Sequence, residues 1–290
     1  MPVLCLIANP IDSELSVALA ARVHKETGGE LNWLNHSIAC EIIEPKSTDA
    51  LAAARAIIAG HAVDAALVPT ENRRKKVLVA DMDSTMINQE CIDELADAVG
   101  LKDKVADITA RAMRGELDFG EALDTRVALL KGLEKSVIEE IRRERITLAA
   151  GGRALIQTMK AYGAYTSLVS GGFTFFADYF GKRIGFDEAI ANVLEFDGTR
   201  LTGTVTKPIV DKQTKLMRLQ ALAAERNLTL AQTIAVGDGA NDLPMLQAAG
   251  MGVALHAKPT VATQAEYRID HADLTALLYL QGYTDEEIVR

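Results

Sequence analysis

The chain has 290 residues with a formal net charge of −9, and 49% of its residues are hydrophobic. This length and composition predict about two domains with ample core, and the acidic charge argues against a nucleic-acid surface, which is usually basic. The amino terminus lacks a secretory pattern, and no apolar run reaches the roughly 18 residues of a membrane-spanning helix. Three widely spaced cysteines, Cys5, Cys40 and Cys91, favour reduced thiols in the cytoplasm.

The first 72 residues are predicted to form a separate domain. Four strands and two helices are expected, near residues 3–8, 13–27, 30–35, 37–43, 49–60 and 64–69. This β-α-β-β-α-β order predicts a ferredoxin-like α+β fold with both helices on one face of an antiparallel sheet. No strand here ends in an acidic cluster, so we expect no catalytic residue in this segment. The basic run at residues 73–76 is interpreted as a linker or the flank of a strand.

The next expected strand, residues 76–80, ends in Asp81 and Asp83 with one residue between them. At the carboxyl end of a central strand, both side chains enter the crevice where open α/β sheets bind ligands. Ser84 and Thr85 offer hydrogen-bond donors beside them. The same residues also suit a turn and a helix cap. Alone, this motif supports catalysis and a structural role about equally.

A second acidic loop lies at residues 233–242, where an apolar strand runs into Asp238, Asn241 and Asp242. If these carboxylates converge with Asp81 and Asp83, like charges about 4 Å apart repel by roughly 4 kcal/mol per pair at an effective dielectric near 20. A bound cation relieves that repulsion, and an all-oxygen ligand set favours Mg²⁺. The sequence offers no Cys/His grouping suited to zinc.

Two further segments offer phosphate-binding groups. The strand at residues 165–169 ends in Ser170, Gly171 and Gly172, whose hydroxyl and N–H groups can hold phosphate oxygens because glycine permits close approach. A turn that needs positive φ is the more common reason for such a run. Lys215 lies on an expected helix at residues 212–225, a position where most lysines only face solvent.

Together these pieces fit phosphoryl transfer through a carboxylate nucleophile, which divides one displacement into formation and hydrolysis of an aspartyl-phosphate. Asp81 would attack phosphorus, and Asp83 would protonate the leaving oxygen and later activate water. Mg²⁺ and Lys215 would offset the developing charge. Positioning and electrostatics carry most of the barrier reduction in such reactions.

Alternating strand and helix signals over residues 73–290 predict a doubly wound, mostly parallel α/β sheet with helices on both faces. Residues 89–150 have a helical pattern and interrupt this sheet after its first strand, as an inserted cap would. Gly115, Gly120 and Gly132 in the cap either end helices or act as hinges. Residues 195–205 predict a hairpin with an Asp-Gly turn, residues 253–255 a late strand, and residues 273–279 and 285–289 helices.

The ordered set of motifs resembles the haloacid-dehalogenase-type phosphatases, and residues 74–285 resemble the phosphoserine phosphatase family within them. The resemblance implies a Rossmann-like core in which Asp81 is the nucleophile and Asp83 the general acid and base. The implied phosphate-binding and substrate-binding residues at the motifs are Ser170, Gly171, Lys215 and Asn241. The implied magnesium ligands are the Asp81 side chain, the Asp83 backbone carbonyl and the Asp238 side chain, with Asp242 supporting them.

The cap would then select the substrate. A phosphoserine head group carries an ammonium and a carboxylate, so a closed site needs an anionic and a cationic partner, ideally an arginine fork for the carboxylate. By resemblance, Glu90 receives the ammonium, Arg126 receives the carboxylate, and Phe119 covers the substrate during closure. Without the resemblance, Glu90 and Arg126 are interpreted as ordinary charges on helix faces. Met113 either lines the same pocket or belongs to the core.

The resemblance thus implies Mg²⁺-dependent hydrolysis of O-phospho-L-serine to L-serine and phosphate, the last step of L-serine biosynthesis. Alternatives are phosphoryl transfer to another hydroxyl, such as that of homoserine, and hydrolysis of another small phosphate ester. The intact catalytic set disfavours a non-catalytic amino-acid sensor. Family members with such an extension often resemble amino-acid-binding (ACT-like) regulatory domains there, but a fold proves no ligand. For that domain, formation of a homodimer or simple stabilisation is at least as well supported as binding of an amino acid.

Overall fold

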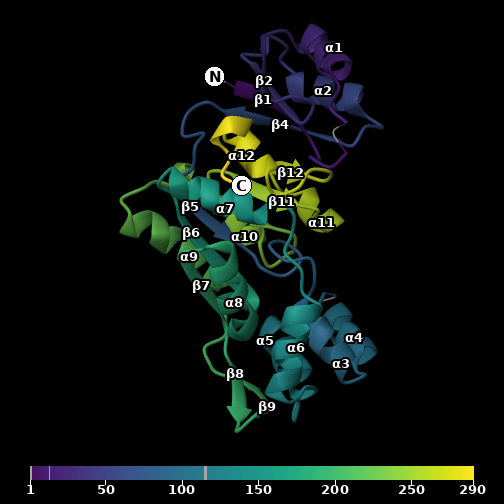
Figure 1. The fold of residues 1–290 in the computed structure, drawn as a ribbon, viewed down its shortest axis with the longest axis vertical. Coiled ribbons are helices and arrows are strands. Elements are labelled where there is room, and N and C mark those ends of the chain that lie inside the picture. The colour runs from purple at the N-terminus through teal and green to yellow at the C-terminus, as the bar shows by residue number, and fades with distance from the viewer. Residues whose placement is uncertain (1, 13, 114–115) are drawn as a thin grey trace.

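The computed structural model describes residues 2–12, 14–113 and 116–290. Gly115, predicted to end a helix or to act as a hinge, and the Met113 side chain, predicted to line the pocket or belong to the core, lie outside this description. Figure 1 shows an elongated molecule with the amino-terminal sheet at one end, a central parallel sheet, and a helical cap and a small hairpin at the other end. Among the described helices, none is long and apolar enough to cross a membrane.

The amino-terminal sheet has the predicted order of elements. They are β1 (Pro2–Ala8), α1 (Val17–Thr27), β2 (Glu30–Asn35), β3 (Ala39–Ile43), α2 (Ala50–Ile58) and β4 (Val63–Pro69). The strands lie in the order β2-β3-β1-β4, and each neighbouring pair is antiparallel, which confirms the ferredoxin-like arrangement. Helix α1 begins later than predicted because the Ser16 hydroxyl caps it by accepting from the Leu19 N–H; the predicted start, Ser13, lies outside the described residues.

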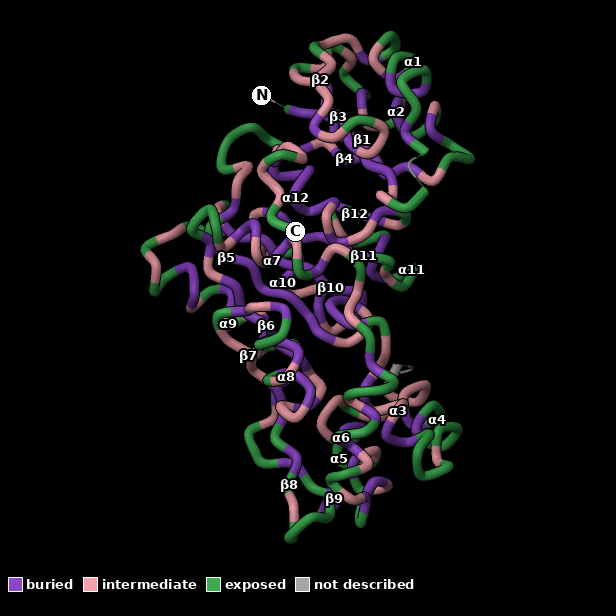
Figure 2. Tube along the Cα trace, in the orientation of Figure 1, coloured by how far each residue is buried: buried purple, intermediate pink, exposed green. Residues whose placement is uncertain are grey.

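Both faces of this sheet are buried, as the continuous apolar sequence of β1 requires. Leu4 and Leu6 pack with α1 and α2 in one hydrophobic cluster. Their neighbours Val3, Cys5 and Ile7 point to the opposite face and join the main core, together with α12 (Ala276–Leu280) near the carboxyl terminus. The tube in Figure 2 shows this continuity of buried chain between the two sheets.

The central sheet is parallel throughout and has the order β12-β11-β10-β5-β6-β7. Its strands are β5 (Val77–Ala80), β6 (Tyr165–Phe173), β7 (Glu188–Asn192), β10 (Thr233–Gly237), β11 (Gly252–Leu255) and β12 (Tyr267–Ile269). This confirms the doubly wound α/β fold and the late strand. The sequence pattern does not predict β7 and β12, the strands at the two edges.

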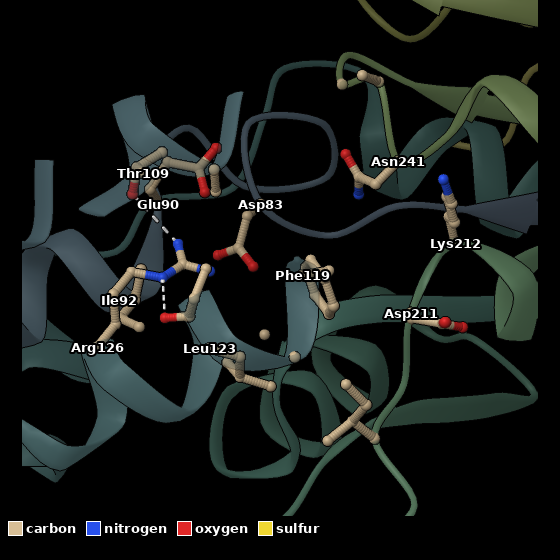
Figure 3. Close-up of a pocket in the computed structure, with 18 of the residues that line it drawn as sticks. Asp83, Glu90, Ile92, Thr109, Phe119, Leu123, Arg126, Asp211, Lys212 and Asn241 are labelled. Carbon is tan, nitrogen blue, oxygen red and sulfur yellow. Dashed lines mark hydrogen bonds between the residues drawn. The ribbon is translucent and has the colours of Figure 1, made fainter. Parts of the chain in front are cut away.

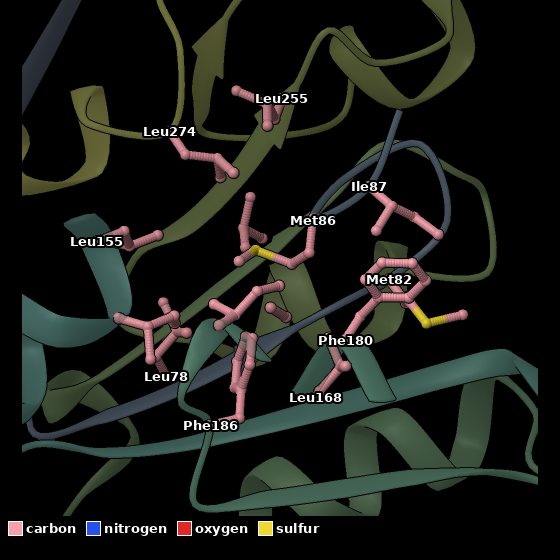
Figure 4. Close-up of a cluster of buried hydrophobic side chains, with 14 of the residues drawn as sticks. Leu78, Met82, Met86, Ile87, Leu155, Leu168, Phe180, Phe186, Leu255 and Leu274 are labelled. Carbon is pink, nitrogen blue, oxygen red and sulfur yellow. The ribbon is translucent and has the colours of Figure 1, made fainter. Parts of the chain in front are cut away.

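Helices cover both faces of this sheet. They are α7 (Gly152–Ala161), α8 (Thr174–Ile184), α9 (Lys212–Glu225), α10 (Leu243–Ala248) and α11 (Pro259–Ala262). Along β5 the side chains alternate: Val77 and Val79 pack with α9 and α10, whereas Leu78 packs with α7 and α8. Figure 4 shows Leu78 and Leu168 in the layer between the sheet and helices α7 and α8. Helix α9 has the predicted bounds, but the predicted helix at residues 285–289 is a single 3₁₀ turn, Asp285–Glu287.

The cap consists of α3 (Cys91–Ala98), α4 (Lys102–Met113), α5 (Phe119–Ala128) and α6 (Lys135–Glu144), inserted between β5 and α7. The predicted hairpin forms β8 (Leu194–Asp197) and β9 (Arg200–Val205), with Gly198 at φ +59° in its two-residue turn. It extends from the core to the cap, where the Gly132 N–H donates to the Leu201 carbonyl at 2.8 Å. Gly120 lies inside α5, so it does not end a helix.

The basic run at residues 73–76 and the start of β4 join the two sheets through specific contacts. Asp64 accepts hydrogen bonds from the backbone N–H groups of residues 270–272 at 2.8, 3.1 and 2.9 Å. Arg73 forms a 2.7 Å ion pair with Glu41 and donates from Nε to the Leu280 carbonyl at 2.8 Å. The basic run therefore connects the two sheets through an ion pair and a hydrogen bond, in addition to joining them along the chain.

Candidate active site

The acidic loop begins where β5 ends, at the carboxyl edge of the central sheet. The backbone N–H of Asp81 still donates to the Val236 carbonyl of β10, at 3.0 Å. Because β10 and β6 flank β5 on its two sides, their ends bring Asp238 and Ser170 to the same edge. The chain turns away at Ser84, which has φ +54°.

Lys215 lies between two buried carboxylates under this edge. Its Nζ is 2.6 Å from Oδ1 of Asp81 and 2.6 Å from Oδ1 of Asp242. Burial opposes the charge on Lys215, but the Asp242 and Asp81 carboxylates outweigh burial and raise its pKa. The helix that carries Lys215 is fixed at its start by Asp211, whose side chain accepts from two backbone N–H groups of the first turn. The structure therefore holds a permanent cation beside the predicted nucleophile.

Three carboxylates converge closely enough to share a metal ion. One oxygen each from Asp81, Asp238 and Asp242 lies within 4.8 Å of the others, and all three residues are buried. Burial and then the Asp242 charge raise the pKa of Asp81 well above its usual range, and the same two causes raise that of Asp238 to about 6. This all-oxygen donor set fits a hard divalent cation, which would relieve the repulsion.

Asp83 has different partners. Its Oδ1 accepts from the Cys91 N–H at 2.9 Å, and its Oδ2 accepts from the Ser170 hydroxyl at 3.3 Å. Burial, followed by the Glu90 charge, raises the pKa of Asp83 to about 6. Its side chain is not part of the three-carboxylate group, and a metal bond from the Asp83 backbone carbonyl stays a prediction. A carboxyl group near neutrality can both give and take a proton.

The glycines after Ser170 are needed for space. A Cβ on Gly172 would lie 2.6 Å from Oδ2 of Asp83, and a Cβ on Gly171 would lie 3.2 Å from the Phe119 ring. The Ser170 hydroxyl accepts from the Gly172 N–H at 2.8 Å. These close approaches show that the Ser-Gly-Gly run packs directly against the acidic loop and the cap, beyond serving as a turn.

A cavity of about 800 Å³ opens over this edge, between the core and the cap (Figure 3). This size suits a small-molecule site. The predicted residues that line it are Asp81, Asp83, Glu90, Phe119, Arg126, Gly171, Asp238 and Asn241. The other predicted residues, Ser170, Lys215 and Asp242, are buried beneath its floor. The structure thus brings every predicted site residue to one place.

The predicted recognition residues Glu90 and Arg126 line the cavity on its cap side, where Asp118 lines it as well. Glu90 precedes α3, and its Oε1 accepts from the Ser84 hydroxyl at 2.8 Å. Arg126 on α5 donates from Nε to the Ala122 carbonyl at 3.1 Å and from one terminal nitrogen to Thr109 Oγ1 at 3.3 Å. Figure 3 shows both of these Arg126 bonds as dashed lines.

Several residues that line the cavity belong to none of the sequence motifs, namely Thr109, Ile209, Asp211, Lys212 and Lys258. Lys258 follows β11, and its Nζ is 3.9 Å from Oδ2 of Asp238. Lysine and threonine on a helix or loop carry no motif of their own. The one usable signal was Asp211, because a helix-cap aspartate just before Lys215 fixes where that helix starts.

The parallel sheet, the inserted cap and the acidic strand ends define a haloacid dehalogenase-like hydrolase, and the model of that family matches residues 78–247. A phosphoserine phosphatase of Streptomyces coelicolor is 41% identical over 294 residues, which cover 98% of this chain and 71% of that protein. The chain belongs to the phosphoserine phosphatase family of these hydrolases.

Solved structures agree with this assignment. The unliganded probable phosphoserine phosphatase from Vibrio cholerae is similar with a TM-score of 0.81 at 31% identity, over 99% of this chain and 88% of that one. A phospho-aspartyl intermediate analogue of phosphoserine phosphatase is similar with a TM-score of 0.66 at 37% identity. That similarity covers 71% of this chain and 98% of the other.

Proposed function

We propose that this site hydrolyses O-phospho-L-serine to L-serine and phosphate, the final step of serine biosynthesis, through a phosphorylated Asp81. The observation that carries the proposal is that one cavity joins phosphate chemistry on its core side to Glu90 and Arg126 on its cap side. A phosphate ester with an ammonium and a carboxylate matches both halves. The name of the Streptomyces coelicolor relative supports this substrate.

The first half-reaction transfers the phosphoryl group to the protein. A carboxylate oxygen of Asp81 forms a bond to phosphorus while the bond between phosphorus and the serine oxygen breaks. Asp83 gives its proton to that oxygen, and L-serine leaves. The pKa of Asp83, about 6, suits this role because a useful fraction of the group carries a proton near neutral pH. The phospho-aspartyl analogue among the similar structures supports such an intermediate.

The second half-reaction restores Asp81. Asp83, now ionised, accepts a proton from a water molecule as the water oxygen attacks phosphorus. The bond between phosphorus and Asp81 breaks, and phosphate is released. Lys215 Nζ is 2.6 Å from Asp81 Oδ1, and this ion pair would keep the carboxylate in one direction during both displacements. Ser170, Gly171 and Asn241 would hold the remaining phosphate oxygens.

Magnesium is the cation that we propose for the three-carboxylate group. Its ligands would be the side chains of Asp81 and Asp238 and the backbone carbonyl of Asp83. Asp242 is already bound by Lys215 and by the Gly239 N–H, at 2.6 and 3.0 Å, so we assign it a supporting role. When bound, Mg²⁺ would neutralise charge on the phosphate and keep Asp81 ionised.

Substrate recognition by the cap is tested by Arg126→Ala. We expect kcat/KM for O-phospho-L-serine to fall about a hundredfold, because a charged two-point hydrogen bond is lost, while p-nitrophenyl phosphate is hydrolysed at nearly the wild-type rate. Arg143→Ala, which removes an exposed arginine from the same cap, serves as the matched control. Equal losses on both esters in Arg126→Ala would contradict the amino-acid substrate.

Adding L-homoserine to the same assay tests phosphoryl transfer. Our proposal predicts that phosphate release continues and that no O-phosphohomoserine forms. Accumulation of O-phosphohomoserine at the expense of phosphate would show that the aspartyl-phosphate reacts with an alcohol instead of water. The nucleophile would then stand, and the hydrolase activity would be withdrawn.

We infer that residues 1–72 and 73–290 form two domains and that the first one stabilises the second through the Asp64 and Arg73 contacts. The similar structure that covers 71% of this chain and 98% of its own length agrees with a catalytic fold that does not need the remaining part. Binding of a regulatory amino acid or formation of a homodimer by residues 1–72 stays a prediction. So does a cytoplasmic location, which rests on three unpaired cysteines.

A further inference from the structure

The Arg126 guanidinium is held in one orientation by two protein groups. Of its five N–H bonds, Nε–H donates to the Ala122 carbonyl one turn earlier on α5, and one terminal N–H donates to Thr109 Oγ1 on α4. Among the described residues these are its only hydrogen bonds. Because Nε–H is occupied, a carboxylate can form a bidentate pair with Arg126 only through the two terminal nitrogens. This is the end-on geometry.

Thr109 is itself fixed. Its hydroxyl donates to the Val105 carbonyl one turn earlier on α4, at 3.0 Å. A hydroxyl has one hydrogen, so towards Arg126 it can only accept. Thr109 therefore links α4 to the guanidinium with a defined direction, and both Thr109 and Arg126 line the cavity.

Carboxylates compete for the same guanidinium. Asp93 and Glu90 both attract Arg126 electrostatically, yet within the described part of the chain neither forms a hydrogen bond or ion pair with it. Such attraction is not directional, so it does not set the side-chain torsion angles of Arg126. Among the described residues, the bond to Thr109 is the only hydrogen bond that Arg126 makes to another helix, and it constrains which edge of the guanidinium faces the cavity.

We propose that Thr109 is a positioning residue that makes the site specific for phosphate esters bearing a carboxylate, by holding the terminal nitrogens of Arg126 for end-on binding. The inference rests on the proposed function, in which Arg126 receives the substrate carboxylate. Thr109 does not take part in the chemistry at phosphorus. Its removal therefore affects substrate binding, and it affects only substrates that have the carboxylate.

The test compares Thr109→Val and Thr109→Ser on two esters, O-phospho-L-serine and O-phosphoethanolamine, which lacks the carboxylate. We expect Thr109→Val to raise KM for O-phospho-L-serine about tenfold, as loss of one hydrogen bond to a charged group does. Its kcat, and both constants for O-phosphoethanolamine, should stay within about twofold. Thr109→Ser keeps the hydroxyl and should restore the wild-type KM.

Thr125→Val is the matched control, because Thr125 on α5 makes the same one-turn hydroxyl bond, to Glu121 at 2.7 Å, but is exposed. Thermal unfolding of each variant reports whether the cap is intact. Equal changes on both esters in Thr109→Val, no change on either, or a failure of Thr109→Ser to restore KM would each overturn the inference. Failure of the proposed function is visible separately, as a wild-type enzyme that does not prefer O-phospho-L-serine.

Discussion

Two buried aspartates, one on a strand of the amino-terminal sheet and one at the edge of the central sheet, show what separates a structural carboxylate from a reactive one. Asp64, at the joint between the two sheets, accepts three backbone N–H bonds from residues 270–272. Asp81 at the sheet edge is bound by Lys215 and by the Met82 N–H, and two other carboxylates lie within 4.8 Å of it. Burial is the main cause that raises the pKa of each.

The two sites differ in which groups oppose the effect of burial on the pKa of the aspartate. At Asp64 the backbone N–H groups lower the pKa again, so the charge is satisfied inside the protein. At Asp81 the Asp242 charge adds to the effect of burial, and Lys215 only partly offsets both. Burial of a carboxylate is therefore no sign of function by itself. Unrelieved like charge at a strand end, facing a cavity, is such a sign.

The same substitution, aspartate to asparagine, can be made at Asp81 and at Asp64, and we expect the larger effect at Asp81. Asp81→Asn should lower turnover of O-phospho-L-serine by roughly a thousandfold or more, because an amide cannot form the acyl-phosphate. The fold should persist, since Asn keeps the shape of the side chain. Phosphate release by the purified variant, with circular dichroism as the control for folding, measures this. A wild-type-like rate would refute Asp81 as nucleophile.

Removal of the proposed Mg²⁺ should change activity through the three-carboxylate group alone. A chelator should abolish phosphate release, and excess Mg²⁺ should restore it. Asp238→Asn should need at least about tenfold more Mg²⁺ for half-maximal rate, because one charged ligand is lost. Asp197→Asn on the exposed hairpin is the control. Full activity in the chelator would mean that Lys215 alone neutralises the site.

At the joint, Asp64→Asn should affect stability and leave catalysis alone. The new NH₂ group would face at least one backbone N–H of residues 270–272, which costs about 2 kcal/mol of unfolding free energy. Turnover at a temperature where the variant is folded should stay within about twofold of wild type. Urea unfolding and initial rates measure the two quantities. A large loss of turnover with unchanged stability would show that the joint controls the site.

The smallest effect is a dependence of stability on pH in the metal-free protein. Asp83 and Asp238 each have a folded-state pKa of about 6, whereas the unfolded chain loses these protons near pH 4. Between about pH 4 and 6 the folded state therefore binds more protons, so stability falls as pH rises through this window. Urea unfolding in a chelator should show this slope, and Asp238→Asn should reduce it. An identical slope in the variant would contradict the assigned cause.

Much of this architecture could be predicted from the sequence because parallel strands gather their carboxyl ends at one edge. Asp81, Ser170 and Asp238 each follow an apolar run of the sequence, so local pattern was enough to bring them together, although Ser170 lies within β6. Lys215 follows a helix cap whose position the sequence also marks. The cap residues Glu90 and Arg126 needed the family resemblance, since a charge on a helix has no local signature.

The rest depends on tertiary contacts. Thr109 gains its role only because α4 packs beside α5, and nothing in the α4 sequence indicates that neighbour. Asp64 lies in an ordinary apolar strand, and its three N–H partners come from a loop about 200 residues later. The edge strands β7 and β12 contain polar residues, among them Glu188 and Arg268, in place of a continuous apolar run, so they form by pairing with a preformed sheet more than by their own pattern.

The most direct test of the account is to trap the intermediate. Wild-type enzyme mixed with Mg²⁺ and excess O-phospho-L-serine, quenched in acid within milliseconds and digested, would be examined by peptide mass spectrometry. We expect one phosphoryl group on the peptide that contains Asp81, and none in Asp81→Asn. Rapid phosphate release with no phosphoryl group on that peptide at any quench time, or a phosphoryl group on another residue, would contradict the account.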